Sequence, residues 1–573
     1  MKNRGGSRHG LPTTQKLTII AQDPSVRLNG KILTTEIEIP AEEILEGPCG
    51  YRINVIDYDS TSNVLYQPAR YEMLDNGSYK DPFKRSRPAR TAAQHNDALV
   101  GDPRFHSQNV YAIAMRILAR FEFALGRRVP WGSHGHQLHV APHAFADANA
   151  FYSKQDRGLF FGYFAGGNGK PVFACLSHDV VAHETTHALL DGLRGRFLEP
   201  SSPDQAAFHE GFADIVALLS VFSLKDLVAK LIDGSTGAAR LIDQKFLEPD
   251  ALRESVLFGL AEQMGEELSK VRGEALRRSI KLAPGRDYMA EPEYQEPHRR
   301  GELLVAAIMN AFLEIWLKRL DRVGFIQGRK RDRSLVIDEG AAVADHLLTM
   351  AIRALDYCPP TDLAFSDYLS ALLTIDREVV PDDSRFNYRE VLVKCFGAYG
   401  IAPDSDADKD GTWRRCDIDL VYSRTHFDSM LRDKEEVFRF LWENRKALDI
   451  VREGYVEVET VRPSFRVAPD GFILRETVAE YVQILTLQVG ELKDALDIDP
   501  PKDMPHWKRV RIFGGGALIF NEYGQLKYQI RNRIEDSKGQ TARLKYLWES
   551  GYFDREPDDK SHFAELHLAR ATD

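Results

Sequence analysis

Residues 179–192 read DVVAHETTHALLDG, and this segment decides the fold of the middle of the chain. Asp179, His183, His187 and Asp191 recur every four residues, whereas the positions between them are mainly apolar. This spacing predicts a buried helix that carries one polar stripe, because residues i and i+4 of a helix lie on the same face. A buried polar stripe is costly unless something satisfies it, and a metal ion bound by both imidazoles would do so.

A second helix is predicted where residues 206–219 read AAFHEGFADIVALL. Its apolar residues recur at helical spacing, which leaves Glu210 and Asp214 one turn apart on the same side. We expect Glu210 to be the third metal ligand, and Asp214 to orient one ligand imidazole by a hydrogen bond. A buried pair of helices with satisfied histidines is the alternative, but the agreement of both segments favours a metal site.

These two segments resemble the thermolysin-like zinc metallopeptidases, a gluzincin family with an HExxH helix followed by an ExxxD helix. The resemblance implies an α+β, two-lobed fold with a strand-rich N-terminal lobe and a helical C-terminal lobe. It implies that zinc is held by His183, His187 and Glu210 and that Glu184 is the general base. Asp214 would be the partner of His183, and we expect Asp191 to lie in the same outer layer around the ligands.

Three further residues follow from the same resemblance. Asn149 and Ala150, in ANAFYS, are similar to the edge strand that holds the peptide in this family. An exposed edge can bind an extended peptide through its unpaired backbone groups. His298, which precedes a long apolar helix, corresponds to a catalytic histidine that stabilises the oxyanion. Taken alone, Asn149 is typical of an ordinary turn and His298 of a histidine on the protein surface.

The sequence departs from the family at one catalytic position. Where the family has a tyrosine that assists the oxyanion, this chain has Phe197 or Leu198. The first hypothesis remains a zinc endopeptidase in which Glu184 accepts a proton from the attacking water. The alternative is a catalytically silent, zinc-holding scaffold whose C-terminal domain binds a partner. The intact Glu184 favours the enzyme, because a structural zinc site needs no general base.

The length of 573 residues predicts several domains. We expect a strand-rich region at 1–100, a zinc-binding lobe at 101–223 and a helical lobe at 224–401. An acidic linker is predicted at 402–419. Residues 420–573 predict a mixed α+β domain with a hairpin turning at 521–524. Regulation, substrate capture and binding of a protein partner are all open as roles of this last domain.

The predicted linker contains a possible calcium loop. Asp406, Asp408, Asp410 and Asp417 fit positions 1, 3, 5 and 12 of an EF-hand-like loop. The residue at position 8 is Trp413, where an aliphatic side chain is usual, and no helix is evident after the loop. A solvated acidic linker is therefore the favoured interpretation.

The composition argues against a nucleic-acid-binding protein and against a membrane-spanning protein. The net charge of −10 gives no basic surface for nucleic acid, and no apolar run is long enough to span a membrane. Five scattered cysteines indicate free thiols in a reducing compartment. Among them, Cys175 is either a structural thiol, which we favour, or a thiolate that blocks the zinc. Without a secretory signal we expect a cytoplasmic protein, with export by another route as the alternative.

Overall fold

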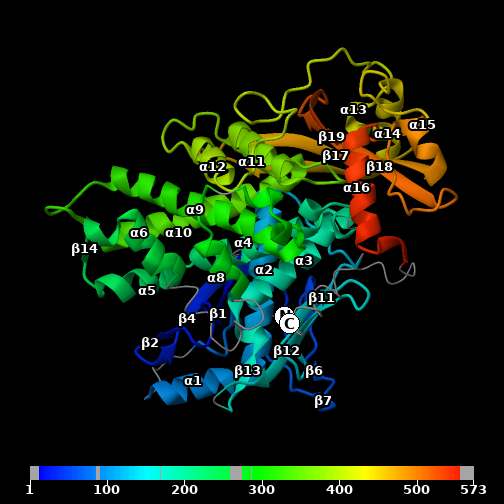
Figure 1. Cartoon of the computed structure of the whole chain (residues 1–573). Helices are drawn as coiled ribbons and strands as arrows, with labels where there is room; N and C mark the ends of the chain where they lie inside the picture. Colours follow the sequence, from blue (N-terminus) through cyan, green and yellow to red (C-terminus); the bar gives the residue numbers. More distant parts are fainter. Residues whose placement is uncertain are drawn as a thin grey trace, which may run out of the picture.

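The computed structural model describes residues 12–84, 91–133, 135–167, 169–199, 201–258, 274–285 and 287–554. Strands gather at two ends of the molecule, and long helices pack between them (Figure 1). This segregation of helices and strands confirms the predicted α+β class. No helix of the described ranges is both long enough and apolar enough to cross a membrane.

The N-terminal strands form small sheets rather than one continuous sheet. β1 (Thr14–Ile20) pairs antiparallel with β4 (Thr34–Pro40), and alternate side chains of both strands are buried. β5 (Ile53–Val55) instead pairs parallel with β10 (Leu138–Phe145). The remaining short strands form three antiparallel pairs: β2 (Arg27–Leu28) with β3 (Lys31–Ile32), β6 (Tyr58–Asp59) with β7 (Val64–Leu65), and β8 (Glu72–Met73) with β9 (Tyr79–Lys80).

The sheet nearest the predicted zinc helix has the order β11–β12–β10–β5. β11 (Ala150–Ser153) is its edge strand and pairs antiparallel with β12 (Gly158–Ala165). β13 (Pro171–Phe173) pairs with the far end of β12. The predicted position of residues 150–153 at a sheet edge is therefore confirmed.

Three long helices form the centre of the molecule: α2 (Pro103–Leu125), α3 (His178–Leu193) and α4 (Pro203–Phe222). α2 starts at Pro103, because Asp102 caps its N-terminus and the proline suits the first turn. Ser202 and Pro203 begin α4 in the same way. α3 packs between α2 and α4, so most of its side chains are buried.

The helical region that follows covers α4. α9 (Pro297–Val323) and α10 (Arg333–Ala354) both pack on α4, and α12 packs on α9. The other described helices and turns of this region are α5 (Lys225–Thr236), α6 (Pro249–Leu252), a π-helical turn (Arg253–Phe258), α8 (Glu274–Lys281), α11 (Phe365–Val379) and α12 (Tyr388–Gly397). β14 (Leu241–Asp243) and β15 (Lys330–Asp332) pair antiparallel and form a two-stranded ribbon.

The C-terminal part is a four-stranded antiparallel sheet in sequence order. It contains β16 (Tyr455–Val467), β17 (Ile473–Gln488), β18 (Arg509–Asn521) and β19 (Leu526–Asn532). The hairpin predicted at 521–524 is confirmed between the last two strands. Helices α13 (Phe427–Met430), α14 (Lys434–Glu443), α15 (Leu492–Leu496) and α16 (Ser537–Glu549) accompany the sheet.

This sheet shares its core with the helices before it. Leu474, Val478 and Tyr528 belong to the same buried cluster as α2, α3 and α4. Arg466 of β16 is fully buried and pairs with Asp356, which follows α10, and with Glu476 of β17. The C-terminal sheet is therefore joined to the helices by apolar packing and by buried charges.

Two connecting segments are more ordered than their sequences indicate. α1 (Ala92–Val100) begins after the N-cap Thr91. The acidic linker predicted at 402–419 is anchored by Trp413, whose indole is buried and donates a hydrogen bond to the carbonyl of Tyr357. A buried indole with a satisfied N–H fixes this segment against the helices, so it is not a solvated linker.

Candidate functional site

Helices α3 and α4 bring the predicted ligand side chains together. His183 and His187 lie one turn apart on α3, and Glu210 lies on the neighbouring α4. Each of the three is at most 2% exposed, and Glu184 beside them is fully buried. The apolar remainder of both helices packs into the main core, which turns the polar stripe of one helix toward the other.

The nitrogen and oxygen atoms of these side chains converge on one point. The Nε2 atoms of His183 and His187 lie 2.8 Å apart. The two carboxylate oxygens of Glu210 lie 3.5 Å from Nε2 of His183 and 3.6 Å from Nε2 of His187. Asp214 contacts the other ring nitrogen of His183, with Nδ1 and Oδ1 2.7 Å apart.

This donor set fits a zinc ion. Two ligand atoms on a tetrahedral zinc are about 3.3 Å apart, given bonds of about 2.0 Å. The spacings from Glu210 to the imidazoles are already close to that value, and the two rings need to separate by about half an ångström. Because Asp214 accepts the Nδ1 proton of His183, Nε2 of that ring is left as the unprotonated nitrogen that a metal requires.

His209 belongs to this cluster, although the sequence did not indicate it. Its Nδ1 lies 2.9 Å from Nδ1 of His187, and the two rings are stacked with centroids 4.9 Å apart. When Nδ1 of His187 donates this hydrogen bond, its Nε2 faces Glu210 without a proton. His209 therefore orients the second imidazole, as Asp214 orients the first. Its position beside Glu210 was visible in the sequence, but nothing in the pattern showed that it faces α3.

Asp191 has a different position from the one predicted. One oxygen accepts a hydrogen bond from the hydroxyl of Tyr152, and the other binds the ammonium group of Lys154, each at 2.8 Å. Burial and the charge of Asp191 raise the pKa of the Tyr152 hydroxyl. Asp191 thus joins the end of α3 to β11 and its following turn, and both of its oxygens have partners there rather than on the ligand imidazoles.

Asn149 and Ala150 lie at the start of the edge strand β11, which packs against α3. The side-chain oxygen of Asn149 accepts a hydrogen bond from the backbone N–H of Ala150 at 2.8 Å, and its backbone carbonyl accepts one from Gly162. The asparagine side chain is therefore turned onto its own chain. Binding of a peptide through this amide remains a prediction.

His298 lies at the start of α9, near the point where α9 packs against α4 beside Glu210. α9 crosses α4 where Gly301 and Gly211 meet, and a Cβ on Gly211 would lie 3.0 Å from the carbonyl oxygen of Gly301. Gly211 follows Glu210, and His298 lies one turn before Gly301. The N-terminus of α9 is therefore on the side of the molecule that carries the ligands.

Glu296 orients the ring of His298. Its Oε1 lies 2.6 Å from Nδ1, and the same carboxylate accepts the backbone N–H groups of His298 and Arg299 as the N-cap of α9. Burial alone would raise the pKa of Glu296, but the hydrogen bond and charge of His298 outweigh it and lower the pKa to about 2. Nε2 of His298 is a buried atom without a hydrogen-bond partner in the described part of the chain.

Phe197 occupies the region where a tyrosine hydroxyl was expected from the resemblance. It lies in the short turn Gly195–Leu198 and is 2% exposed. Its ring packs edge-on against Phe208 of α4, with centroids 5.7 Å apart. The side chain serves the core between α3 and α4, and it offers no hydrogen-bond donor.

The possible calcium loop has partners that compete with an ion. Oδ1 of Asp410 accepts hydrogen bonds from Thr412, and Oδ2 lies 3.2 Å from Arg377. Asp408 pairs with Arg414. No helix follows before α13, which begins at Phe427. These carboxylates therefore have partners within the protein, and calcium binding here remains the less favoured prediction.

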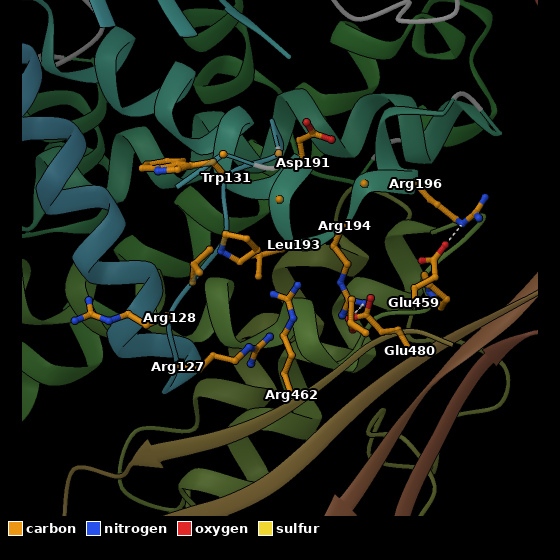
Figure 2. A pocket seen from close by; sticks show the side chains of 18 of the residues that line it. Arg127, Arg128, Trp131, Asp191, Leu193, Arg194, Arg196, Glu459, Arg462 and Glu480 are labelled. Carbon is orange, nitrogen blue, oxygen red and sulfur yellow. Dashed lines mark hydrogen bonds and ion pairs between the residues drawn. The ribbon is translucent and has the colours of Figure 1, made fainter. Parts of the chain in front are cut away.

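A cavity of 1030 Å³ opens at the C-terminal end of α3, between the helices and β16 (Figure 2). Arg127, Arg194 and Arg462 reach into it, and Arg196 pairs with Glu459 at its rim. Asp191 lines it, but His183, His187, Glu184 and Glu210 do not. This arginine-rich space is therefore separate from the ligand cluster on the same helix.

Comparisons with protein-family models and with curated proteins find no match for this chain.

Proposed function

We propose that this chain is a zinc-dependent metallopeptidase, most simply an endopeptidase, with the two-lobed arrangement of the thermolysin-like family. The observation that supports it most is the convergence of the ligand atoms. The Nε2 atoms of His183 and His187 face the two oxygens of Glu210 at 3.5 and 3.6 Å, and Asp214 holds the outer nitrogen of His183. Two imidazoles and one carboxylate are the ligands of a catalytic zinc that keeps one position open.

When bound there, zinc would polarise the scissile carbonyl and acidify a water molecule. Glu184 follows His183 on the same turn, so its carboxylate can take the proton of the attacking water. It then gives that proton to the nitrogen of the leaving amine as the carbon–nitrogen bond breaks. When both ring nitrogens of His298 carry protons, Nδ1 donates to Glu296 and Nε2 would donate a hydrogen bond to the oxyanion.

The peptide would lie along β11, because this strand forms the edge of the described sheet and an edge can pair with an added strand. The position of β11 beside α3 supports this, since a strand added there would run past the ligand cluster. A peptide that accepts the Ala150 N–H would require the Asn149 amide to turn away from it. The substrate class is therefore an extended peptide or an unfolded protein segment.

The proposal is tested with the purified full chain, by elemental analysis and by digestion of a mixed peptide library. We expect zinc in the wild type and cleavage of peptides by attack of water. His183→Ala and Glu210→Ala should each lose zinc from this site and lose cleavage. Cleavage that survives in both variants would contradict the ligand assignment. A wild type that holds zinc at these residues but cleaves no peptide would favour the silent scaffold instead.

A further inference from the structure

A second group of metal-binding side chains lies outside the proposed active site. His106 of α2, His143 of β10 and Cys175, in the turn just before α3, each offer a ligand atom, and these atoms all lie within 4.8 Å of one another. The three side chains are at most 2% exposed. We propose that they form a structural site for a divalent cation of the zinc class.

The two imidazoles have the arrangement that ligand histidines need. Nδ1 of His106 lies 2.7 Å from Nε2 of His143. The opposite nitrogen of His143 lies 2.8 Å from a carboxylate oxygen of Asp57, and that of His106 lies 3.0 Å from the carbonyl oxygen of Val100. Ligand histidines usually give their other N–H to a carboxylate or a backbone carbonyl, as both rings do here.

Cys175 supplies the donor that distinguishes a metal site from a pair of hydrogen-bonded rings. If the two rings only shared a proton, the nearby Cys175 thiol would take no part in their contact. A metal between them would bind the thiolate as well, and a set of two nitrogens and one sulfur suits zinc. Cys175 is also fixed in place, because Asn109 donates a hydrogen bond to its backbone carbonyl at 2.9 Å.

The balance of charge agrees with this set. The three proposed ligands and Asp57 are buried, so the charge of a bound metal and the charges around it have to balance one another. One thiolate and the carboxylate of Asp57 balance the two positive charges of a zinc ion.

The site would join three elements that are far apart in the sequence. α2, β10 and the start of α3 meet at this point, and Phe173 packs edge-on against both imidazoles. A metal here would fix the entry to α3, the helix that carries His183. This role is structural, because the ligand atoms are buried and a structural metal needs no access for substrate.

The decisive measurement uses cobalt, because sulfur is present in only one of the two sites. The full-length His183→Ala variant, which has lost the proposed catalytic site, is loaded with Co²⁺ and examined by absorption spectroscopy. We expect one bound cobalt per chain with a thiolate-to-cobalt charge-transfer band. Absence of bound cobalt, or bound cobalt without this band, would overturn the proposal.

A cysteine pair provides the matched control. Cys175→Ser in the His183→Ala background should abolish the band, whereas Cys358→Ser should keep it. Cys358 is also fully buried, but its thiol donates to the carbonyl of Ala354. If the band survives in Cys175→Ser, the band comes from another thiol and the proposed site is refuted.

If Cys175→Ser does not fold, X-ray absorption on the zinc-loaded His183→Ala chain replaces this control. A zinc–sulfur distance of about 2.3 Å supports the proposal, and a shell of nitrogen and oxygen alone refutes it.

Discussion

The two histidine pairs of this molecule are alike in their spacing and different in their surroundings. The facing nitrogens are 2.8 Å apart in His183 and His187 and 2.7 Å apart in His106 and His143. In both pairs an aspartate holds the outer nitrogen of one ring. The aspartates differ, because the side chain of Asp214 is 29% exposed whereas that of Asp57 is 5% exposed.

The difference teaches how one pair can serve catalysis and the other structure. The pair on α3 has a carboxylate as its third donor, a second carboxylate in Glu184, and the partly exposed Asp214 beside it. The pair on α2 and β10 has a thiol as its third donor and the buried Asp57 beside it. A general base beside the metal suits hydrolysis, and a buried set with a thiolate and no such base suits a metal that only holds the chain together.

The largest expected effect is a loss of peptide cleavage, which tests whether the histidine pair on α3 carries the catalytic chemistry. Glu184→Gln should lower peptide cleavage by about three to four powers of ten, because an amide cannot accept the proton of the attacking water. Zinc content should stay at the wild-type value, since Glu184 is not a ligand in this assignment. Peptidase assays and elemental analysis of the same preparation check both statements. Wild-type cleavage by this variant would show that another group acts as the base.

A smaller effect is expected at the start of α9. His298→Ala should lower kcat/KM by about two to three powers of ten and keep zinc, because it removes a donor to the oxyanion. The loss should appear mainly in kcat, since this contact strengthens in the transition state. Steady-state kinetics on one peptide measure the two constants separately. His346→Ala is the control, because His346 lies on α10 near Tyr388 and should not change either constant. A change confined to KM would place His298 in substrate binding.

The smallest expected effect is a loss of metal affinity when either of the two aspartates is replaced. Asp214→Asn should weaken metal binding at the pair on α3 by about tenfold to a hundredfold, and Asp57→Asn should do the same at the other pair. Peptide cleavage should fall only in the first variant. Thermal stability should fall more in the second, because its metal joins three elements. Competition with a chelator and thermal melts measure these changes. Equal loss of cleavage in both variants would contradict the division of roles.

The proposed active site could be predicted because its signals are local. His183 and His187 lie on one helix, and the apolar spacing around Glu210 shows the second helix without knowledge of the fold. The α+β class was implied by the family resemblance that the same two segments carry. Asp191 was misplaced because helical spacing shows which face a residue shares, but not which strand covers the far end of that face.

The rest depends on contacts between distant parts of the chain. His106 and His143 are 37 residues apart, on a helix and a strand, and no spacing rule connects them with Cys175. α1 was missed because it is short and its polar residues stand together in the middle, so it lacks the apolar period that indicates a helix. Trp413 was expected in a linker because acidic neighbours surround it, whereas tertiary packing decides its burial.

The buried arginine of the C-terminal sheet ties that sheet to the segment after α10. Arg466 has no exposed surface, and its guanidinium is held by Asp356 on one side and Glu476 on the other. Asp356 also pairs with Arg127, so pulling the sheet away would remove one of the two cations that hold this buried carboxylate. The energy that keeps α10 in place against α4 therefore includes a contribution from residues more than a hundred positions later.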